Sequence, residues 1–311
     1  MSSYRFCRTD DISLLVDALN RCRAPYCPDE PPATAVSFKR SIRDLQVWCS
    51  SCMVAFSGSD PIGVLIGAKR PSGTLVHTIA IHPDHRRQGH GRHLLTSLSS
   101  KLAILGPPRI VAEVPETIAS ACELFSASGY VQEALLTDYV LPFDSRESVP
   151  LAQGRPFDSR TWGPPSGGAG IDAATLTHDG LMIPVTVDDL AANGLLGETD
   201  RQVCWERSVE TLTARKDDIA GLAIASDERI EAYVLYVSRG MEETELVSLR
   251  SFIDDGGARL KQLLAQLRAR GMETFRFPKV HPDEVSKEWL KTLGLLAVAS
   301  HCLYAARARA A

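Results

Sequence analysis

The sequence has no long hydrophobic run and no large excess of charge of one sign. Its longest apolar stretches, such as residues 63–67, fall far short of the roughly 18 to 20 residues that span a bilayer, so we expect no membrane contact. The net charge of −4 argues against a nucleic-acid partner, because surfaces that bind nucleic acid are usually basic. The first residues lack the basic start and apolar core of a secretory signal, and we therefore expect a cytoplasmic protein.

Cysteines are also few. Eight in 311 residues do not make a disulfide framework, and cytoplasmic thiols stay reduced. Cys22 and Cys27, together with Cys49 and Cys52, form two closely spaced pairs that would suit a zinc ion. Cys52, however, begins an apolar run, and buried cysteines commonly behave as small hydrophobic residues. We favour this packing role and expect no metal.

What the sequence does contain is enough apolar side chain for two domains. Hydrophobic residues make up 44% and charged residues 23%, as in an ordinary globular protein, and the length suits two domains of common size. Residues 143–180 show no sustained apolar period and include a run rich in glycine and proline, which is typical of a linker. We therefore predict an N-terminal domain over 1–142, a linker over 143–180 and a second domain over 181–311.

The first segment alternates between strand and helix patterns, and the second segment repeats their order. Residues 221–237 resemble the hairpin at 52–70, and residues 288–294 resemble 123–129. Two echoes in the same order favour a duplicated fold over a chance match of common patterns. In the first segment we expect strands at 4–8, 53–56, 62–69, 75–81 and 109–114, helices at 10–19, 38–45, 94–105 and 119–128, and one or two closing strands at 130–141.

The most informative stretch, residues 79–95, leads from a predicted strand into a predicted helix. Gly89 and Gly91 leave the backbone N–H groups unobstructed where the helix begins, and a helix start offers free N–H donors and the positive end of the helix dipole. The stretch therefore predicts a phosphate-binding loop, although it matches neither the dinucleotide fingerprint nor the P-loop. Three arginines add positive charge around the turn: Arg86, Arg87 and Arg92.

Two histidine pairs in the same stretch have a spacing that metal sites also use. They are His82 with His85 and His90 with His93. A metal at this position would have to share the loop with a phosphate site and its arginines, so we favour histidines without a metal.

The loop spacing R-x-x-G-x-G, from Arg86 to Gly91, resembles the acetyl-CoA signature of the GNAT (GCN5-related N-acetyltransferase) family of acyl-CoA N-acyltransferases. Residues 121–130 are similar to that family's second conserved region. The resemblance covers residues 4–142 and is fainter over 181–305. It implies an α+β fold of two tandem GNAT-like domains, each a mixed, mainly antiparallel sheet with helices on both faces.

The resemblance also implies that acetyl-CoA is the co-substrate and names the residues that bind it. Backbone groups of one strand would pair with the pantetheine arm, and amides of the loop would hold the pyrophosphate. The implied cofactor-binding residues are Ile79, Ala80, Ile81, Arg86, Arg87, Gln88, Gly89, His90, Gly91 and Arg92.

Members of this family are understood to transfer the acyl group directly to an amine, which needs a general base and is often helped by a tyrosine acid. Here Phe125 stands at the usual tyrosine position and Ile118 at a position that is often asparagine. Either Tyr139 or a water supplies the proton, or the acid is dispensable. For the general base we consider Glu113 and His77.

The second repeat lacks the loop, because only residues 253–255 separate Phe252 from Gly256, and two of the three are acids that would repel a pyrophosphate. We expect this degenerate domain to have lost cofactor binding and to support the first. The expected function is N-acetylation of a small-molecule or peptide amine. A non-catalytic CoA-binding or sensing module, or a pseudoenzyme, is the alternative, and the acceptor amine and oligomeric state stay open.

Overall fold

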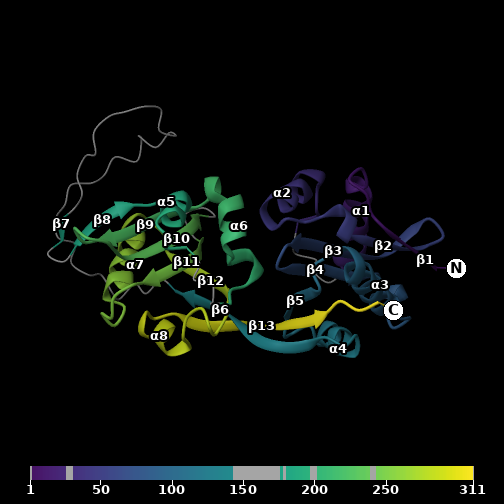
Figure 1. Cartoon of the computed structure of the whole chain (residues 1–311). Helices are drawn as coiled ribbons and strands as arrows, with labels where there is room; N and C mark the ends of the chain where they lie inside the picture. Colours follow the sequence, from purple (N-terminus) through teal and green to yellow (C-terminus); the bar gives the residue numbers. More distant parts are fainter. Residues whose placement is uncertain are drawn as a thin grey trace.

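The computed structural model describes residues 2–25, 31–142, 176–177, 180–196, 202–238 and 243–310. Two lobes lie side by side, and two long strands run from one lobe to the other (Figure 1). The elements from the first part of the chain are β1 (Ser2–Phe6), α1 (Ile12–Arg23), α2 (Ala35–Leu45), β2 (Met53–Ser57), β3 (Asp60–Arg70), β4 (Gly73–Ile81), α3 (His90–Leu105), β5 (Arg109–Pro115), α4 (Ala119–Ala127) and β6 (Val131–Leu141). Short 3-10 turns lie at Cys49–Ser51 and Pro83–His85.

The second part of the chain repeats much of this order, as the echoes in the sequence predict. Its elements are β7 (Leu176–Thr177), β8 (Gly180–Pro184), α5 (Val187–Ala192), the 3-10 turn η3 (Trp205–Arg207), α6 (Val209–Ala214), the 3-10 turn η4 (Lys216–Asp218), β9 (Ala220–Ala225), β10 (Ile230–Ser238), β11 (Glu243–Ser251), α7 (Ala258–Ala269), β12 (Thr274–Val280), α8 (Lys287–Thr292) and β13 (Leu296–Arg307).

Helices cover both faces of the sheet in each lobe because each helix has one apolar face. In the first lobe α1 and α2 pack on one face with β2 to β4, and the leucine face of α3 packs with α4 on the other. In the second lobe α7 and α8 cover one face, and α5 and α6 the other. The mixed sheet with helices on both faces confirms the fold class expected from the sequence.

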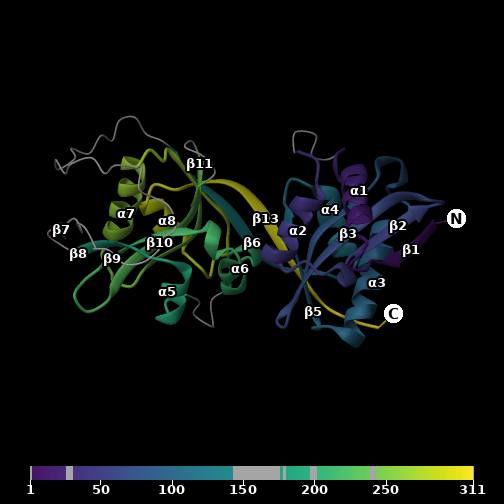
Figure 2. The ribbon, with the colours of Figure 1, turned by 90° about the horizontal axis from the view of Figure 1, so that it is seen from above.

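The described strands form one continuous 13-stranded sheet, which the sequence does not foretell. The order is β1-β2-β3-β4-β5-β13-β6-β12-β11-β10-β9-β8-β7, so the last strand of the chain lies between β5 and β6. The strand β13 pairs with β5 from His301↔Pro115 to Arg307↔Arg109, while β6 pairs with β12. Each lobe thus completes its sheet with a strand from the other part of the chain, as both ribbon views show (Figures 1 and 2).

This exchange bears on the domain boundaries. The ranges 1–142 and 181–311 stay a prediction, but neither range contains all the strands of its lobe, because β6 and β13 cross between them. Residues 130–141, expected to form one or two closing strands, form the single strand β6. Nearly all of the predicted linker lies outside the described residues.

Two further expectations concern membranes and metals. No helix in the described ranges is long and apolar enough to cross a bilayer. Within the same ranges no group of three or more potential ligand side chains could hold a metal ion. Cys22, Cys49 and Cys52 are buried as free thiols, while Cys27 lies outside the described residues. Burial raises the pKa of the Cys22 thiol to about 11, which is the behaviour of a packed, unreactive cysteine.

Candidate functional site

The strands β4 and β5 run parallel but pair over a short distance before they separate. Their recorded pairs are Thr74↔Ile110 and Leu75↔Val111. On its other side β4 stays paired with β3, where the register shifts so that His77 is an extra residue in β4. Such a β-bulge bends the strand and turns its side chain away from the regular pattern. The bulge therefore lies where β4 begins to leave β5.

The loop after β4 ends in a helix start that no side chain caps. Gly89 is the N-cap residue of α3 with φ of 87°, and Arg87 also has a positive φ of 60°. Neighbouring residues whose φ angles alternate between positive and negative values turn their backbone N–H groups toward a common point and form an anion-binding nest. Because the first amides of a helix also lack intrahelical partners, the start of α3 is suited to a phosphate.

The histidines of this loop bind neighbouring side chains. His90 is buried, and its Nδ1 lies 2.6 Å from the hydroxyl of Tyr4 in β1. The ring of His93 packs against the same tyrosine, with 3.8 Å between ring centroids. Burial lowers the pKa of His90 below its ordinary value. These contacts attach the helix start to the edge of the sheet.

The corresponding helix start in the second lobe is already occupied by a carboxylate of the chain itself. Asp255 accepts hydrogen bonds from the backbone N–H of Gly257 at 2.9 Å and of Arg259 at 2.8 Å. These amides belong to the N-cap and the first turn of α7. A phosphate at this helix start would have to displace Asp255 and approach its charge, which supports the prediction that this domain has lost cofactor binding.

Phe125 is buried in α4 between two tyrosine rings. It stacks on Tyr304 of the exchanged strand β13, with 5.8 Å between centroids, and meets Tyr130 edge to face at 5.1 Å. A phenyl ring held between two aromatic rings contributes packing and no proton. The usual position of the family's acid is therefore part of the core here.

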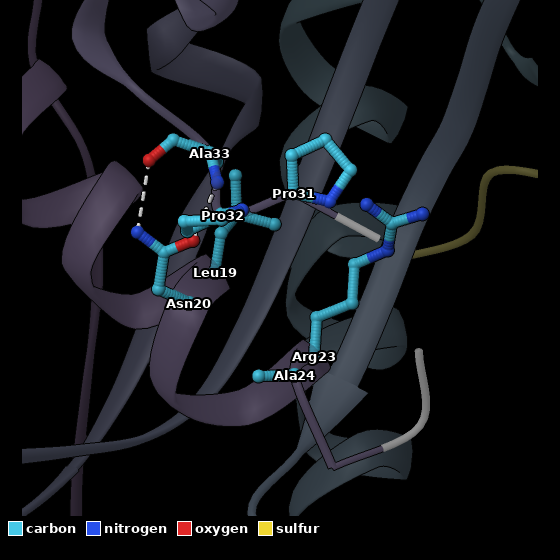
Figure 3. Close-up of a pocket in the computed structure, with 7 residues that line it drawn as sticks. All are labelled: Leu19, Asn20, Arg23, Ala24, Pro31, Pro32 and Ala33. Atoms are coloured by element: carbon cyan, nitrogen blue, oxygen red, sulfur yellow. Dashed lines mark hydrogen bonds between the residues drawn. The ribbon is translucent and has the colours of Figure 1, made fainter. Parts of the chain in front are cut away.

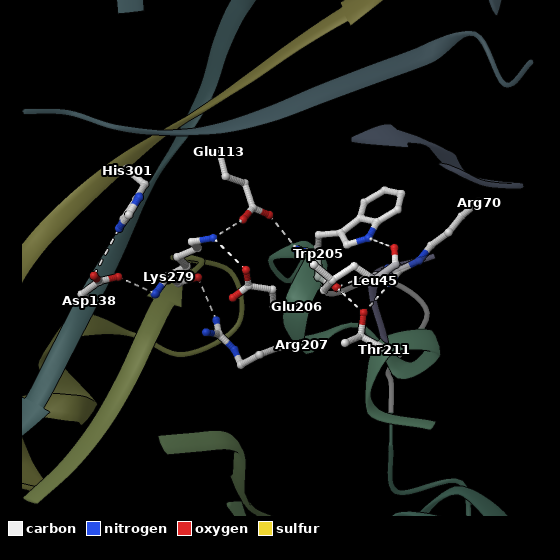
Figure 4. Close-up of polar contacts among 10 residues, drawn as sticks. All are labelled: Leu45, Arg70, Glu113, Asp138, Trp205, Glu206, Arg207, Thr211, Lys279 and His301. Atoms are coloured by element: carbon white, nitrogen blue, oxygen red, sulfur yellow. Dashed lines mark hydrogen bonds and ion pairs between the residues drawn. The ribbon is translucent and has the colours of Figure 1, made fainter. Parts of the chain in front are cut away.

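Glu113 on β5 does not stand alone but binds two groups of the second half of the chain (Figure 4). Its Oε2 lies 3.1 Å from Nζ of Lys279, and its Oε1 accepts the backbone N–H of Trp205 at 2.7 Å. Lys279 also contacts Oε1 of Glu206 at 3.2 Å. We call Glu113, Glu206 and Lys279 the interlobe cluster. Because its carboxylate is engaged twice, Glu113 is less able to accept a substrate proton, and its role as a base stays a prediction.

Lys279 occupies an unusual backbone conformation for a residue with a side chain. Its φ is 50°, at an irregularity in the pairing of β12 with β6. Two side chains hold this conformation through hydrogen bonds to the main chain of Lys279. Its N–H donates to Asp138 Oδ1 at 2.7 Å, and its carbonyl accepts from Arg207 Nη2 at 2.8 Å. Burial lowers the pKa of Lys279, but Glu113 and Glu206 outweigh that effect and raise it. A strained residue held by so many contacts is common at functional sites.

A second set of contacts joins the two lobes beside this cluster. The indole N–H of Trp205 donates to the Leu45 carbonyl at 2.9 Å, and the guanidinium of Arg70 stacks on the indole at 3.9 Å. Arg70 also binds the hydroxyls of Ser208 and Thr211. Burial lowers the pKa of Arg70 to about 10. The turn η3 and the helix α6 are thus attached to the α1 and α2 face of the first lobe.

His77 is exposed, yet both lobes act on it. The protein around the imidazole reduces its contact with water and so lowers its pKa. Of the charges that act on it, Glu206 and Glu113 oppose this lowering, while Lys279 and Arg23 add to it. A neutral imidazole at neutral pH is the form that a general base requires. His77 in β4 and Glu113 in β5 belong to neighbouring strands of the sheet.

Tyr139 lies elsewhere. It is buried in the apolar core of the second lobe, opposite Phe277 of β12 and Ala297 of β13. Burial raises the pKa of its hydroxyl. This position argues against the prediction that Tyr139 gives a proton to the leaving thiolate.

Two hollows lie near these elements. The connection between α1 and α2 encloses about 30 Å³ beside Asn20, which binds both backbone groups of Ala33 (Figure 3). That volume suits a water rather than a substrate. A larger hollow of about 480 Å³ is lined by residues from both halves of the chain, Glu113 and Trp205 among them.

Sequence reasoning missed Lys279, Glu206 and Trp205. Each comes from the second half of the chain and reaches the first lobe through the exchanged strands and η3. No local motif marks them, because their spacing along the chain bears no relation to a helix or strand period. The sequence signal that bears on these residues is the duplicated fold, because it predicts a second lobe close to the first.

The fold is the acyl-CoA N-acyltransferase fold, present in tandem. Residues 15–130 match the model of the acetyltransferase (GNAT) family, and the fold of the whole chain is similar to that of a tandem GNAT protein. Comparison with curated protein sequences gives no match.

Solved structures of similar fold cover almost the whole chain. A tandem GNAT protein from the clavulanic acid biosynthesis pathway is 15% identical with a TM-score of 0.61, over 99% of each chain. A GCN5-related N-acetyltransferase from Sphaerobacter thermophilus is 13% identical with a TM-score of 0.62, over 99% of this chain and 96% of the other. One from Anabaena variabilis is 12% identical with a TM-score of 0.58, over 99% and 73%. At such low sequence identities, the similarity to these structures is evidence for the fold alone.

Proposed function

We propose that this protein is an acetyl-CoA-dependent N-acyltransferase that acetylates a primary amine in its first lobe. The observation that carries the proposal is the separation of β4 from β5 next to an uncapped helix start with the R-x-x-G-x-G loop. Backbone groups of Ile79, Ala80 and Ile81 would pair with the pantetheine arm. The loop from Arg86 to Arg92 would hold the pyrophosphate through its amides and charges.

In this scheme the reacting amine loses a proton to His77 and its nitrogen attacks the thioester carbonyl carbon. The carbon–sulfur bond then breaks, the acetyl group stays on nitrogen, and the CoA thiolate leaves. Since Phe125 gives no proton and Tyr139 lies in the other lobe's core, water protonates the thiolate, and the proton held by His77 returns to that water. A CoA thiolate is a tolerable leaving group, so this arrangement is compatible with turnover.

The test is the release of free CoA thiol from acetyl-CoA with a panel of primary amines, together with the CoA stoichiometry. We expect amine-dependent thiol release and one CoA bound per chain, because Asp255 closes the second helix start. Two CoA molecules per chain would contradict the assignment of the site to one lobe.

The absence of an acid at Phe125 keeps one alternative open, a non-catalytic CoA-binding module. Tight CoA binding without thiol release on any amine would favour that module. No binding of CoA at all would contradict both functions.

A further inference from the structure

Cys122 on α4 and Cys302 on the exchanged strand β13 are free thiols that the proposed mechanism does not use. Cys302 is paired with Val114 of β5. The thiol of Cys122 lies 3.9 Å from the carbonyl oxygen of Pro115, the next residue along β5. Two cysteines that are far apart in the sequence thus come to the same point of the sheet.

A second contact fixes how α4 lies along β13. The hydroxyls of Ser126 and Tyr304 are 3.5 Å apart. Ser126 follows Cys122 by about one helical turn, an advance of about 6 Å on the same face of the helix. Tyr304 follows Cys302 by two residues, an advance of about 7 Å on the same face of the strand. Because the two advances are nearly equal, the two cysteines face each other one step before the two hydroxyls.

The two thiols also act directly on each other. Burial raises the pKa of the Cys302 thiol, and the charge and a hydrogen bond of Cys122 raise it further. Cys302 belongs to the apolar cluster beneath α4, and Cys122 packs against that cluster. A disulfide joins sulfur atoms about 2 Å apart, so two thiols that already share a hydrogen bond need only a small shift to form one.

One member of the pair can be reached from solvent. Among the cysteines in the described ranges, Cys122 alone is partly exposed, while Cys302 is 5% exposed. An accessible cysteine beside a second, resolving cysteine is the arrangement that redox-sensing thiols use. Disulfides that do form in reducing compartments are mostly of this transient kind.

We propose that Cys122 and Cys302 are a thiol modification site, which a low-molecular-weight disulfide oxidises to an intramolecular disulfide. The Cys122 thiolate attacks one sulfur of the reagent, whose S–S bond breaks, and one thiolate leaves. The Cys302 thiolate then attacks Sγ of Cys122, and the second thiolate leaves as the new S–S bond forms. The protons of the two cysteines end on the two released thiols, so the cysteines are oxidised and the reagent is reduced.

The disulfide would tie α4 to β13 and keep β13 in its place between β5 and β6. A bond between residues so far apart in sequence restricts the unfolded chain, and the oxidised protein should therefore unfold at a higher temperature. This inference does not rest on the proposed function, because neither the thiol chemistry nor its readout involves CoA.

The experiment treats the folded full chain with glutathione disulfide and maps the products by mass spectrometry without reduction. We expect the loss of two free thiols, a crosslinked peptide pair that contains Cys122 and Cys302, and a rise in Tm of at least about 5 °C that dithiothreitol reverses. Cys122→Ser should show neither the crosslink nor the rise. Cys204→Ser removes a different buried thiol, and this control should still form the crosslink.

The wild-type measurement decides the inference without depending on the folding of any variant. Glutathione that stays attached to Cys122, a crosslink between other cysteines, or no reaction at all overturns it and leaves the proposed function standing. A crosslink that leaves Tm unchanged overturns the restraint on β13. If no amine releases thiol from acetyl-CoA, the proposed function fails, and the peptide map still decides this inference.

Discussion

Lys279 Nζ lies 3.1 Å from Glu113 Oε2, and this ion pair joins β12 of one lobe to β5 of the other. Its partners are distant in sequence and meet because two strands are exchanged. The pair therefore bears on the stability of the contact between the lobes and on Glu113, a candidate base.

Replacing Lys279 by Met is expected to destabilise the protein by about 3 kcal/mol, because it leaves the 4% exposed carboxylate of Glu113 without its cation. Lys216→Met is the control, since Lys216 pairs with Asp188 on the surface and such pairs contribute about 0 to 1 kcal/mol. Urea denaturation measures both. Equal losses in the two variants would show that the interlobe pair contributes no more than a surface pair.

Gly89→Asp is expected to weaken CoA binding at least about tenfold, because it places a negative charge at the start of α3 where the pyrophosphate is proposed to bind. Gly58→Asp is the matched control. Both glycines have a positive φ, 87° and 61°, and an added Cβ meets no neighbour at either, so the backbone strain is similar. Isothermal titration with CoA should separate them, and equal affinities would contradict the phosphate site.

The pH dependence of kcat/KM is expected to show an acid limb below pH 6.5. His77 is the proposed base, and its pKa lies below the ordinary 6.5, so activity is lost as pH falls through this lowered pKa and His77 becomes protonated. His77→Gln should remove the limb and lower kcat by about a hundredfold. Glu113→Gln should keep the limb. A limb that disappears with Glu113 instead would transfer the role of base to that residue.

A chain that ends at Gly294 is expected to lose CoA binding although it keeps every residue of the CoA loop. It lacks β13, which supplies the neighbour of β5 and the Tyr304 ring that stacks on Phe125. Exposed edges of β5 and β6 should also promote aggregation. A chain that ends at Ala308 keeps all thirteen strands and should behave as the full chain does. Size-exclusion chromatography and CoA titration measure the outcome, and a monomeric, CoA-binding protein ending at Gly294 would contradict the importance of the exchange.

Much of the fold could be predicted because local patterns report local structure. The leucines of α3 share one helical face, and the hairpin of β2 and β3 is readable from its apolar strands and the turn around Gly58. The short acidic turn at residues 253–255 already indicated a changed helix start, and the structure adds that Asp255 binds its amides.

The partners of Glu113 could not be predicted in this way. Ionic and hydrogen-bond contacts between residues far apart in sequence depend on the pairing of whole strands, and no periodicity records which strand inserts beside β5. Tyr139 shows the same limit, since its strand was foreseen but its lobe was not.

The sequence by itself determined the duplicated α+β fold, the loop from Arg86 to Arg92 and the inequality of the two halves, because these depend on residues that are neighbours along the chain. Only the tertiary structure decided that β6 and β13 change lobes and that Lys279 binds both Glu113 and Glu206. The physical reason is that strand pairing and burial of charge depend on the whole sheet, in which residues more than a hundred positions apart become neighbours.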